Sequence, residues 1–215
     1  MKKGDTTIAE VYDILAKEFK KNRTPVVDLI EVQTNDPFKV LIATILSART
    51  KDEVTAAASR RLFERVDNHR KLGKLTVEEI EKMIYPVGFY KNKARQLKSL
   101  PAVLDKEFNG QIPDDVDELT KLPGVGRKTA NLVVAVAFKK PAVCVDVHVH
   151  RIFNRLGYIN TNTPLETEME LRRILPQKYW TTFNSYFVSF GQHRCKPIKP
   201  VCGDCPVAGY CANRN

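Results

Sequence analysis

Residues 118–155 read ELTKLPGVGRKTANLVVAVAFKKPAVCVDVHVHRIFNR. Within this stretch, residues 122–126 form a Gly-rich turn between two runs of helical apolar periodicity. Gly124 and Gly126 permit backbone angles that other residues resist, and Pro123 pre-sets one turn dihedral. Such a turn points backbone N–H groups outward beside the positive end of the next helix, which favours a phosphate. The stretch predicts an anion-binding hairpin between two helices; a plain helix–helix turn is the alternative.

The amino-acid composition indicates the broad class of protein and of binding partner. The 215 residues carry 35 Lys and Arg against 25 Asp and Glu, a formal net charge of +10. This excess favours a polyanionic partner, of which nucleic acid is the commonest, although a soluble basic protein is the alternative. The start of the sequence shows neither a signal peptide nor a membrane span, so we expect a cytoplasmic protein with reduced thiols.

Helical patterns with cap signals follow one another along the chain, and almost no strand signal survives, so we predict an all-α fold. Asp36 before Pro37 starts one helix, Thr50 with Glu53 caps the next, and Thr76 with Glu79 caps another. Further predicted features are a helix over 92–108 that Pro101 kinks or breaks, hairpin helices over 114–121 and 127–138, and a buried extended connector over 142–145.

Four cysteines near the end of the sequence form the strongest local motif. Cys195, Cys202, Cys205 and Cys211 are spaced C-x6-C-x2-C-x5-C. Four thiols in one short loop of a cytoplasmic protein indicate a metal centre. By spacing alone this centre is either a structural zinc or an iron–sulfur cluster. Cys144 stands apart among apolar neighbours and is interpreted as a buried small hydrophobe.

Three motifs together carry a resemblance to a known family. LPGVGRKTA resembles the helix-hairpin-helix of the endonuclease III family of DNA glycosylases, and VDVHVHRI resembles that family's catalytic-aspartate segment. The cysteine spacing matches the family's loop, which implies a [4Fe–4S] cluster. The resemblance further implies a six-helix barrel domain over residues 30–140 and a second helical domain from 1–29 and 141–215. The DNA would lie in a cleft between these domains.

The resemblance implies catalytic roles for Lys128 and Asp146, which lies eighteen residues further along. A Lys amine attacks a sugar carbon only when it is unprotonated. The helix start and the neighbouring Arg127 and Lys121 would both disfavour the ammonium form. Asp146 would assist proton transfers and stabilise the cationic sugar. Taken singly, Lys128 could instead bind a phosphate and Asp146 could simply cap a helix.

Further residues are expected to bind DNA. Arg49 stands where the family usually has a Gln that enters the duplex, and Phe89 stands where a wedge Leu is usual; a core aromatic is the alternative for Phe89. These two departures leave the opposite-base preference open. His148 is expected to contact phosphate or to orient Asp146. The hairpin residues expected to bind DNA are Leu122, Gly124, Val125, Gly126 and Arg127.

The resemblance therefore predicts a base-excision repair glycosylase with abasic-site lyase activity on oxidised pyrimidines in duplex DNA. One alternative is a thymine or uracil mismatch glycosylase of the same superfamily, whose members tend to lack the Lys. The other alternative is a non-catalytic DNA-binding module with a structural metal. We expect a monomer, associated with the nucleoid in the cytoplasm, whose partner is double-stranded DNA with damaged bases or abasic sites.

Overall fold

The computed structural model describes residues 5–20 and 36–213, and for residues 5–7 the backbone alone. These residues form helices and loops without a strand, which confirms the predicted all-α fold. None of these helices is long and apolar enough to cross a membrane. The elements are α1 (Asp5–Phe19), α3 (Pro37–Ser47), α4 (Asp52–Phe63), α5 (His69–Lys74), α6 (Val77–Ile84), α7 (Tyr90–Phe108), α8 (Val116–Leu119), α9 (Arg127–Ala137), α10 (Val147–Leu156), α11 (Pro164–Ile174), α12 (Phe183–His193), and the 3₁₀ turns Gln177–Tyr179 and Ala208–Tyr210.

The chain divides into two compact units. The first unit combines Met1–Thr24 with Pro141–Asn215, and the second unit is Pro25–Lys140. The boundary predicted between residues 29 and 30 lies outside the described residues.

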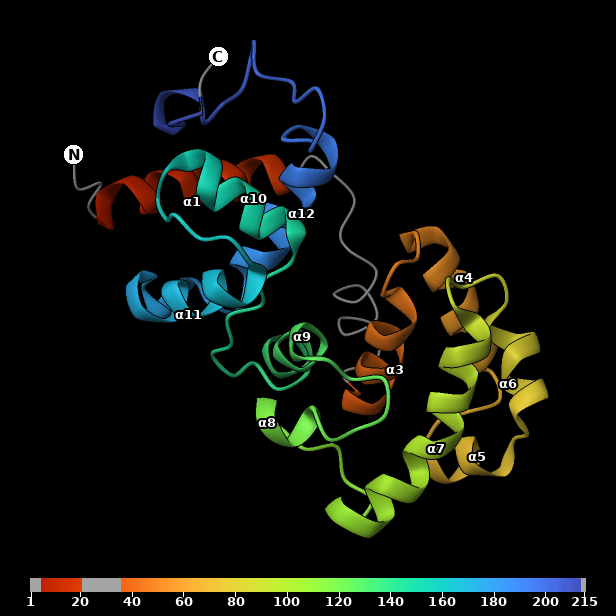
Figure 1. The fold of residues 1–215 in the computed structure, drawn as a ribbon. Coiled ribbons are helices and arrows are strands. Elements are labelled where there is room, and N and C mark those ends of the chain that lie inside the picture. The colour runs from red at the N-terminus through yellow and green to blue at the C-terminus, as the bar shows by residue number, and fades with distance from the viewer. Residues whose placement is uncertain (1–4, 21–35, 214–215) are drawn as a thin grey trace. The chain divides into compact units, whose positions relative to one another are not determined.

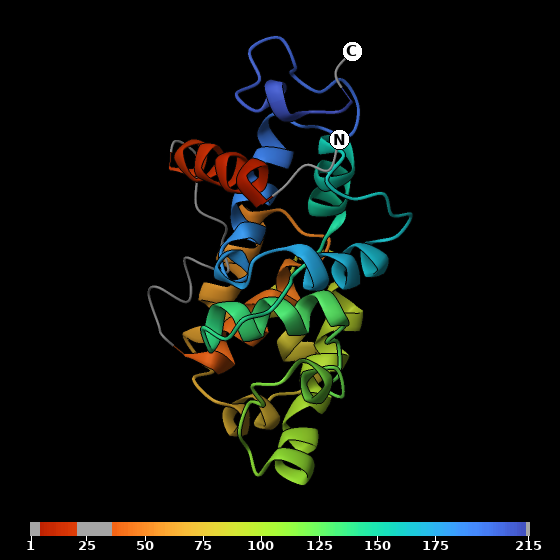
Figure 2. The same cartoon turned by 90° about the vertical axis from the view of Figure 1, so that its left-hand side faces the viewer.

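The first unit has an aromatic core. Helix α1 packs against α12, and α10 contacts both α11 and α12 (Figures 1 and 2). The Phe153 ring of α10 stacks on Phe187 of α12, with ring centroids 4.5 Å apart and planes 9° apart. The stripe Ile8, Val11 and Leu15 brings α1 into the same core. Both ends of the sequence therefore contribute to one hydrophobic cluster.

The second unit is organised around α3. This helix packs against α4, α7 and α9, while α5 and α6 pack on α7 (Figure 1). Every residue from Val40 to Leu46 is buried, which explains the near-continuous apolar run of this helix. Because α3 touches both the hairpin helix α9 and the long helix α7, it fixes the positions of the loops that adjoin them.

Most of the predicted helix caps are present. The Asp36 carboxylate accepts from the Phe38 N–H ahead of Pro37, and Thr76 with Glu79 forms a complete capping box. The cap predicted at Thr50 is wrong. Lys51 precedes α4 without a side-chain cap, and the Thr50 hydroxyl instead accepts the Gly88 N–H at 3.1 Å. The Thr50 hydroxyl therefore forms a tertiary hydrogen bond instead of the helix cap that the local sequence pattern predicted.

Pro101 is predicted to kink or break its helix, and the break is absent, since α7 runs continuously from Tyr90 to Phe108. The proline is buried, and its ring lies against Gly73 of α5, where an added Cβ would come within 3.3 Å. Packing against this glycine offsets the backbone hydrogen bond that proline cannot donate. The end predicted at Asn109 is confirmed, with Asn109 in the left-handed conformation as the C-cap.

Candidate active site and cluster loop

The hairpin between α8 and α9 presents its backbone rather than its apolar side chains. Leu122 and Val125 are buried, so contact with DNA would involve their main chain. Gly124 has a φ of +79°, which favours glycine, and a Cβ there would meet the Gln96 side chain at 2.9 Å. Gly126 has nothing within 4 Å of such a Cβ, and it is the N-cap of α9. The open space beside this helix N-terminus is suited to close approach by a phosphate.

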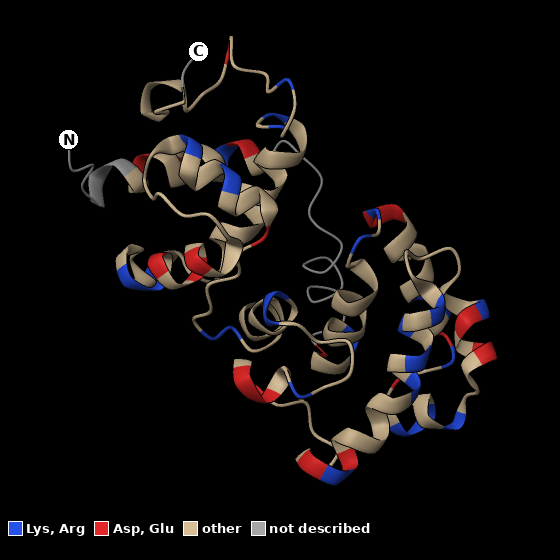
Figure 3. Ribbon diagram, viewed as in Figure 1, with Lys and Arg blue, Asp and Glu red and all other residues tan. Residues whose placement is uncertain are grey.

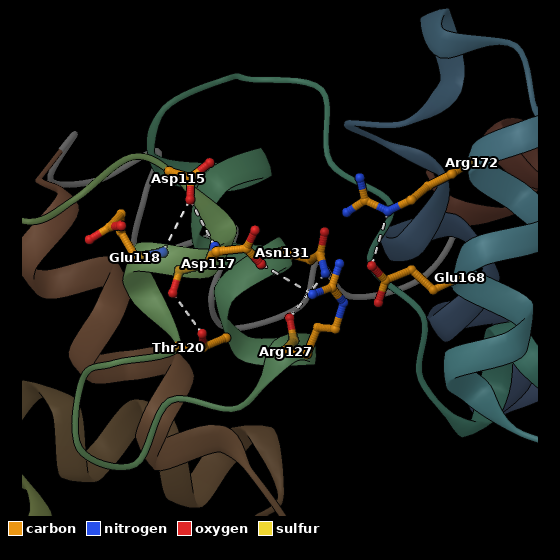
Figure 4. A network of polar contacts seen from close by, with 8 residues as sticks. All are labelled: Asp115, Asp117, Glu118, Thr120, Arg127, Asn131, Glu168 and Arg172. Carbon is orange, nitrogen blue, oxygen red and sulfur yellow. Dashed lines mark hydrogen bonds and ion pairs between the residues drawn. The ribbon is translucent and has the colours of Figure 1, made fainter.

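Carboxylates of α8 form ion pairs with basic residues on both sides of the hairpin. Asp115 caps α8 by accepting the N–H groups of Asp117 and Glu118, and the Arg127 guanidinium lies 3.3 Å from the Asp117 carboxylate (Figure 4). Lys121 is paired with Glu118 at 2.8 Å. Figure 3 shows acidic residues at α8, and both acidic and basic residues on other elements of each unit. The predicted first hairpin helix, 114–121, shortens to Val116–Leu119 because Asp115 provides its cap.

Lys128 is exposed in the first turn of α9, directly after the hairpin. The two cations expected to disfavour its ammonium form, Arg127 and Lys121, are each paired with a carboxylate. Their charges are therefore partly balanced by these carboxylates. Lys128 is thus at the surface, next to the hairpin.

Asp146 caps α10, as predicted. Its Oδ1 atom accepts the N–H groups of His148 and Val149, each at 2.9 Å, and the residue is buried. The connector before it, residues 142–145, is neither helix nor strand and is buried. The Asn184 amide donates to the Cys144 carbonyl at 3.0 Å, which fixes this connector to α12. The carboxylate is thus held at a defined position by the cap and by the buried segment that precedes it.

His148 is held in place by Arg151 and Gly191. Its Nδ1 atom lies 3.0 Å from an Arg151 nitrogen, and because guanidinium only donates, Nδ1 is the acceptor. A Cβ on Gly191 would lie 2.6 Å from this Nδ1, so glycine is required for the ring to lie there. The expectation that His148 orients Asp146 applies to its backbone, whose N–H donates to that carboxylate.

Arg49 and Phe89 lie together in the second unit although forty residues separate them. The Arg49 guanidinium is 5.5 Å from the centroid of the Phe89 ring, and the ring is 63% exposed. This exposure rules out the core-aromatic interpretation of Phe89. Both residues have positive φ, 53° and 58°, which places each side chain at the tip of a sharp turn. They line one pocket of about 240 Å³ with Lys93 and Gly124.

The cysteine loop is attached to α10 by two arginines. Arg151 donates twice to the Cys195 carbonyl, and Arg155 donates to the Cys195 sulfur at 3.4 Å and to the Lys196 carbonyl at 2.8 Å. Within residues 5–20 and 36–213 no three Cys, His, Asp or Glu side chains already converge on one metal ion. The donor set fits a cluster on chemical grounds, because four thiolates ligate a [4Fe–4S] centre and Arg155 partly balances their charge.

Comparison with known proteins decides the family. The family model for the HhH-GPD superfamily of base excision DNA repair proteins matches residues 42–177. The chain belongs to this superfamily. The model for the iron–sulfur binding domain of endonuclease III matches residues 195–211, from the first to the last of the four cysteines, so the glycosylase-type chain carries an iron–sulfur domain.

Individual relatives of this HhH-GPD protein show to which family within the superfamily it belongs. Endonuclease III of Thermotoga maritima is 43% identical over 95% of this chain and 92% of its own length. A trapped covalent intermediate of endonuclease III with DNA has a TM-score of 0.83 at 38% identity, covering 97% of this chain and 96% of that one. A thermostable thymine-DNA glycosylase has a TM-score of 0.85 at 26% identity, covering 97% of each chain. The chain is a member of the endonuclease III family.

The buried side chain of Lys93 in this endonuclease III family member was not predicted from the sequence. Its Nζ donates to the Leu46 carbonyl at 2.8 Å and to the Ala48 carbonyl at 2.6 Å, and the side chain is buried. Burial lowers the pKa of the Lys93 ammonium to about 8. Nothing local marks it, since it is one of several Lys residues on α7 and its acceptors lie 45 and 47 positions away.

Proposed function

We propose that Lys128 is the nucleophile and Asp146 the proton-transfer residue in removing oxidised pyrimidines from duplex DNA. Membership of the endonuclease III family makes the chain a base-excision repair DNA glycosylase with abasic-site lyase activity. The observation that carries the proposal is that Lys128 is exposed in the first turn of the helix that follows a glycine hairpin. A buried Asp146 carboxylate fixed at a helix cap complements it.

The chemistry follows from these two groups. The Lys128 amine forms a bond to the anomeric carbon of the sugar, and the glycosidic bond breaks with its electron pair leaving on the base, which takes up a proton. Ring opening gives an imine between Lys128 and the sugar. This imine acidifies the adjacent carbon, whose proton is removed as the bond to the 3′ phosphate breaks. Water then hydrolyses the imine and releases the enzyme.

Asp146 would act through its carboxylate charge. Its cap hydrogen bonds hold the carboxylate in place, so that it is oriented before the substrate arrives. There it would accept and return the protons that the amine and the sugar exchange, and stabilise the cationic sugar.

The hairpin would grip the backbone of the DNA. Its glycines leave room for a phosphate next to the N-terminus of α9, and the net charge of +10 favours association with a polyanion. Arg49 and Phe89 would enter the duplex where the damaged base leaves the stack, because an apolar wedge replaces part of the lost stacking. The protein would act as a monomer on double-stranded DNA with damaged bases or abasic sites, at the nucleoid.

The domain roles are also proposed. Residues 30–140 would form the six-helix barrel that carries the hairpin and Lys128. Residues 1–29 with 141–215 would form the domain that carries Asp146 and the cluster. When bound, the [4Fe–4S] cluster held by Cys195, Cys202, Cys205 and Cys211 would order this loop and remain apart from the bond-breaking steps.

Borohydride trapping tests the nucleophile, because reduction of the imine leaves a permanent link between protein and DNA. The wild-type protein should form this adduct on duplex DNA with an abasic site, as the trapped complex of the relative suggests. Lys128→Gln should lose the adduct yet still bind the duplex. Lys121→Gln is the matched control, since Lys121 lies before the same hairpin and should leave trapping unchanged. Adduct at wild-type yield in Lys128→Gln would reject this assignment.

One observation favours a second candidate, a thymine or uracil mismatch glycosylase. The likeness to a thymine-DNA glycosylase over 97% of the chain supports it. A strand-nicking assay on an abasic duplex separates the candidates, because a glycosylase without lyase activity leaves the strand intact, as does a non-catalytic DNA-binding module. Glycosylase assays on oxidised pyrimidines and on thymine or uracil opposite guanine would then assign the substrate.

A further inference from the structure

Two loops of the second unit come together at Arg49 and Phe89. Arg49 follows α3, and Phe89 immediately precedes α7 as its N-cap. Both residues have a positive φ, a conformation that is strained for a residue with a side chain. The guanidinium lies over the aromatic ring, 5.5 Å from its centroid. Two strained tips therefore form one exposed pair, and other contacts must hold them there.

Lys93 supplies the main contact. It lies in the first turn of α7, and its N–H donates to the Phe89 carbonyl at 3.0 Å. Its side chain reaches the end of α3, where Nζ donates to the carbonyls of Leu46 and Ala48. An ammonium at the C-terminal end of a helix also complements the negative end of the helix dipole. Lys93 thus links the base of the Phe89 loop to the base of the Arg49 loop.

Thr50 and Gly88 complete the link. The Thr50 hydroxyl accepts from Lys93 Nζ at 3.3 Å and from the Gly88 N–H at 3.1 Å. A Cβ on Gly88 would lie 2.4 Å from the Arg49 carbonyl oxygen, so the two backbones touch where the glycine lies. The acceptors come from one loop and the donors from the other, which leaves little freedom for either tip to move alone.

We propose that Lys93 is a positioning residue that holds Arg49 and Phe89 together as one preorganised element for entry into the DNA duplex. This inference rests on the DNA-binding roles proposed above for those two side chains. The buried position of Lys93 is a costly place for an ammonium, and its donors are directed to loop carbonyls. Preorganisation matters most when the protein must open a stacked base pair, because ordering loose tips on insertion costs free energy.

The experiment compares two substrates that differ in how much opening they require. One is a duplex with an oxidised pyrimidine paired opposite a purine, and the other holds the same lesion in a short unpaired bubble, where the stack is already open. Lys93→Met keeps the length of the side chain and removes its donors. On the paired lesion its single-turnover rate should fall by about ten- to hundred-fold, since small misplacements cost this much. The bubble substrate should be cleaved at the wild-type rate.

Two further variants sharpen the test. Lys98→Met is the matched control, because Lys98 on the same helix donates to the Gly73 carbonyl at 2.7 Å, away from this pocket; both substrates should react normally. Gly88→Ala should reproduce the substrate-dependent loss through the contact with the Arg49 carbonyl, and it keeps the proposal testable if Lys93→Met does not fold.

The outcomes separate the possibilities. A wild-type rate of Lys93→Met on the paired lesion, or an equal loss on both substrates, would overturn the positioning role. Normal cleavage of both substrates by Gly88→Ala would overturn it as well. Wild-type protein that cleaves neither substrate would instead overturn the proposed function, which is a different failure.

Discussion

At the scale of the residue, Asp146 combines a structural and a chemical role that one substitution can separate. Asp146→Asn should keep the hydrogen bonds to the N–H groups of His148 and Val149, because Asn caps helices as well as Asp does. Single-turnover cleavage should nevertheless slow by about 10²- to 10⁴-fold, since a neutral amide neither accepts the proton nor balances the sugar's charge. The melting temperature should change little.

Asp115→Asn is the matched control for that variant, because Asp115 caps α8 by the same kind of contact. It should leave both cleavage and melting temperature close to those of the wild type. Cleavage by Asp146→Asn at the wild-type rate would show that Asp146 is only a helix cap.

At the scale of the element, the binding of DNA phosphates by the hairpin can be tested with a substitution that leaves its fold intact. Gly126→Asp places a carboxylate in open space at the N-cap of α9, a position where Asp is favoured, so the protein should remain stable. Binding to damaged and undamaged duplex should weaken alike, because phosphate contacts carry no sequence information. Losing one charged hydrogen bond of about 1.5–3 kcal/mol raises Kd by roughly ten- to hundred-fold.

Gly126→Asn controls for size, since it adds the same bulk without the charge. A binding titration at two salt concentrations would compare the three proteins, and the wild-type affinity should fall with salt. Equal affinity of Gly126→Asp and the wild type would leave the hairpin as a simple turn.

The cysteine loop is the second element with a direct test. The pure protein should be yellow-brown and contain about four irons per chain, as a [4Fe–4S] centre requires. Cys202→Ser should lose that absorbance and weaken DNA binding, because the loop is anchored to α10 through Arg151 and Arg155. Cys144→Ser is the control outside the loop and should retain the iron. Metal analysis that finds one zinc and no iron would contradict the cluster.

At the scale of the whole molecule, the sequence predicted what is local and missed what is distant. The helix caps at Asp36, Thr76 and Asp146 were predictable because each depends on neighbouring residues. The cap predicted at Thr50 is absent because its hydroxyl accepts the N–H of Gly88, which is 38 positions away. The role of Lys93 was not predicted because its hydrogen-bond acceptors lie at the end of another helix. Tertiary contacts of this kind leave no periodicity or spacing in the sequence.

The site was predictable to a similar degree. The spacing of the cysteines and the letters of the hairpin indicated the family, and the family models match these regions. The pairing of Arg49 with Phe89 was not predictable from spacing, since it requires two left-handed turns to face each other. The roles assigned to Lys128 and Asp146 stay predictions until the variants above are measured.

The first unit draws its core from both ends of the sequence, and this has a consequence for synthesis on the ribosome. Helix α1 is made before the whole of the second unit, but its packing partner α12 begins only at Phe183. During the interval Ile8, Val11 and Leu15 lack their partner, although each gains about 1.5–3 kcal/mol on burial. The second unit is complete in the nascent chain before α12 emerges. Helix α1 therefore waits for its packing partner while the whole second unit is synthesised, and during this time it is a target for chaperones that bind exposed apolar segments.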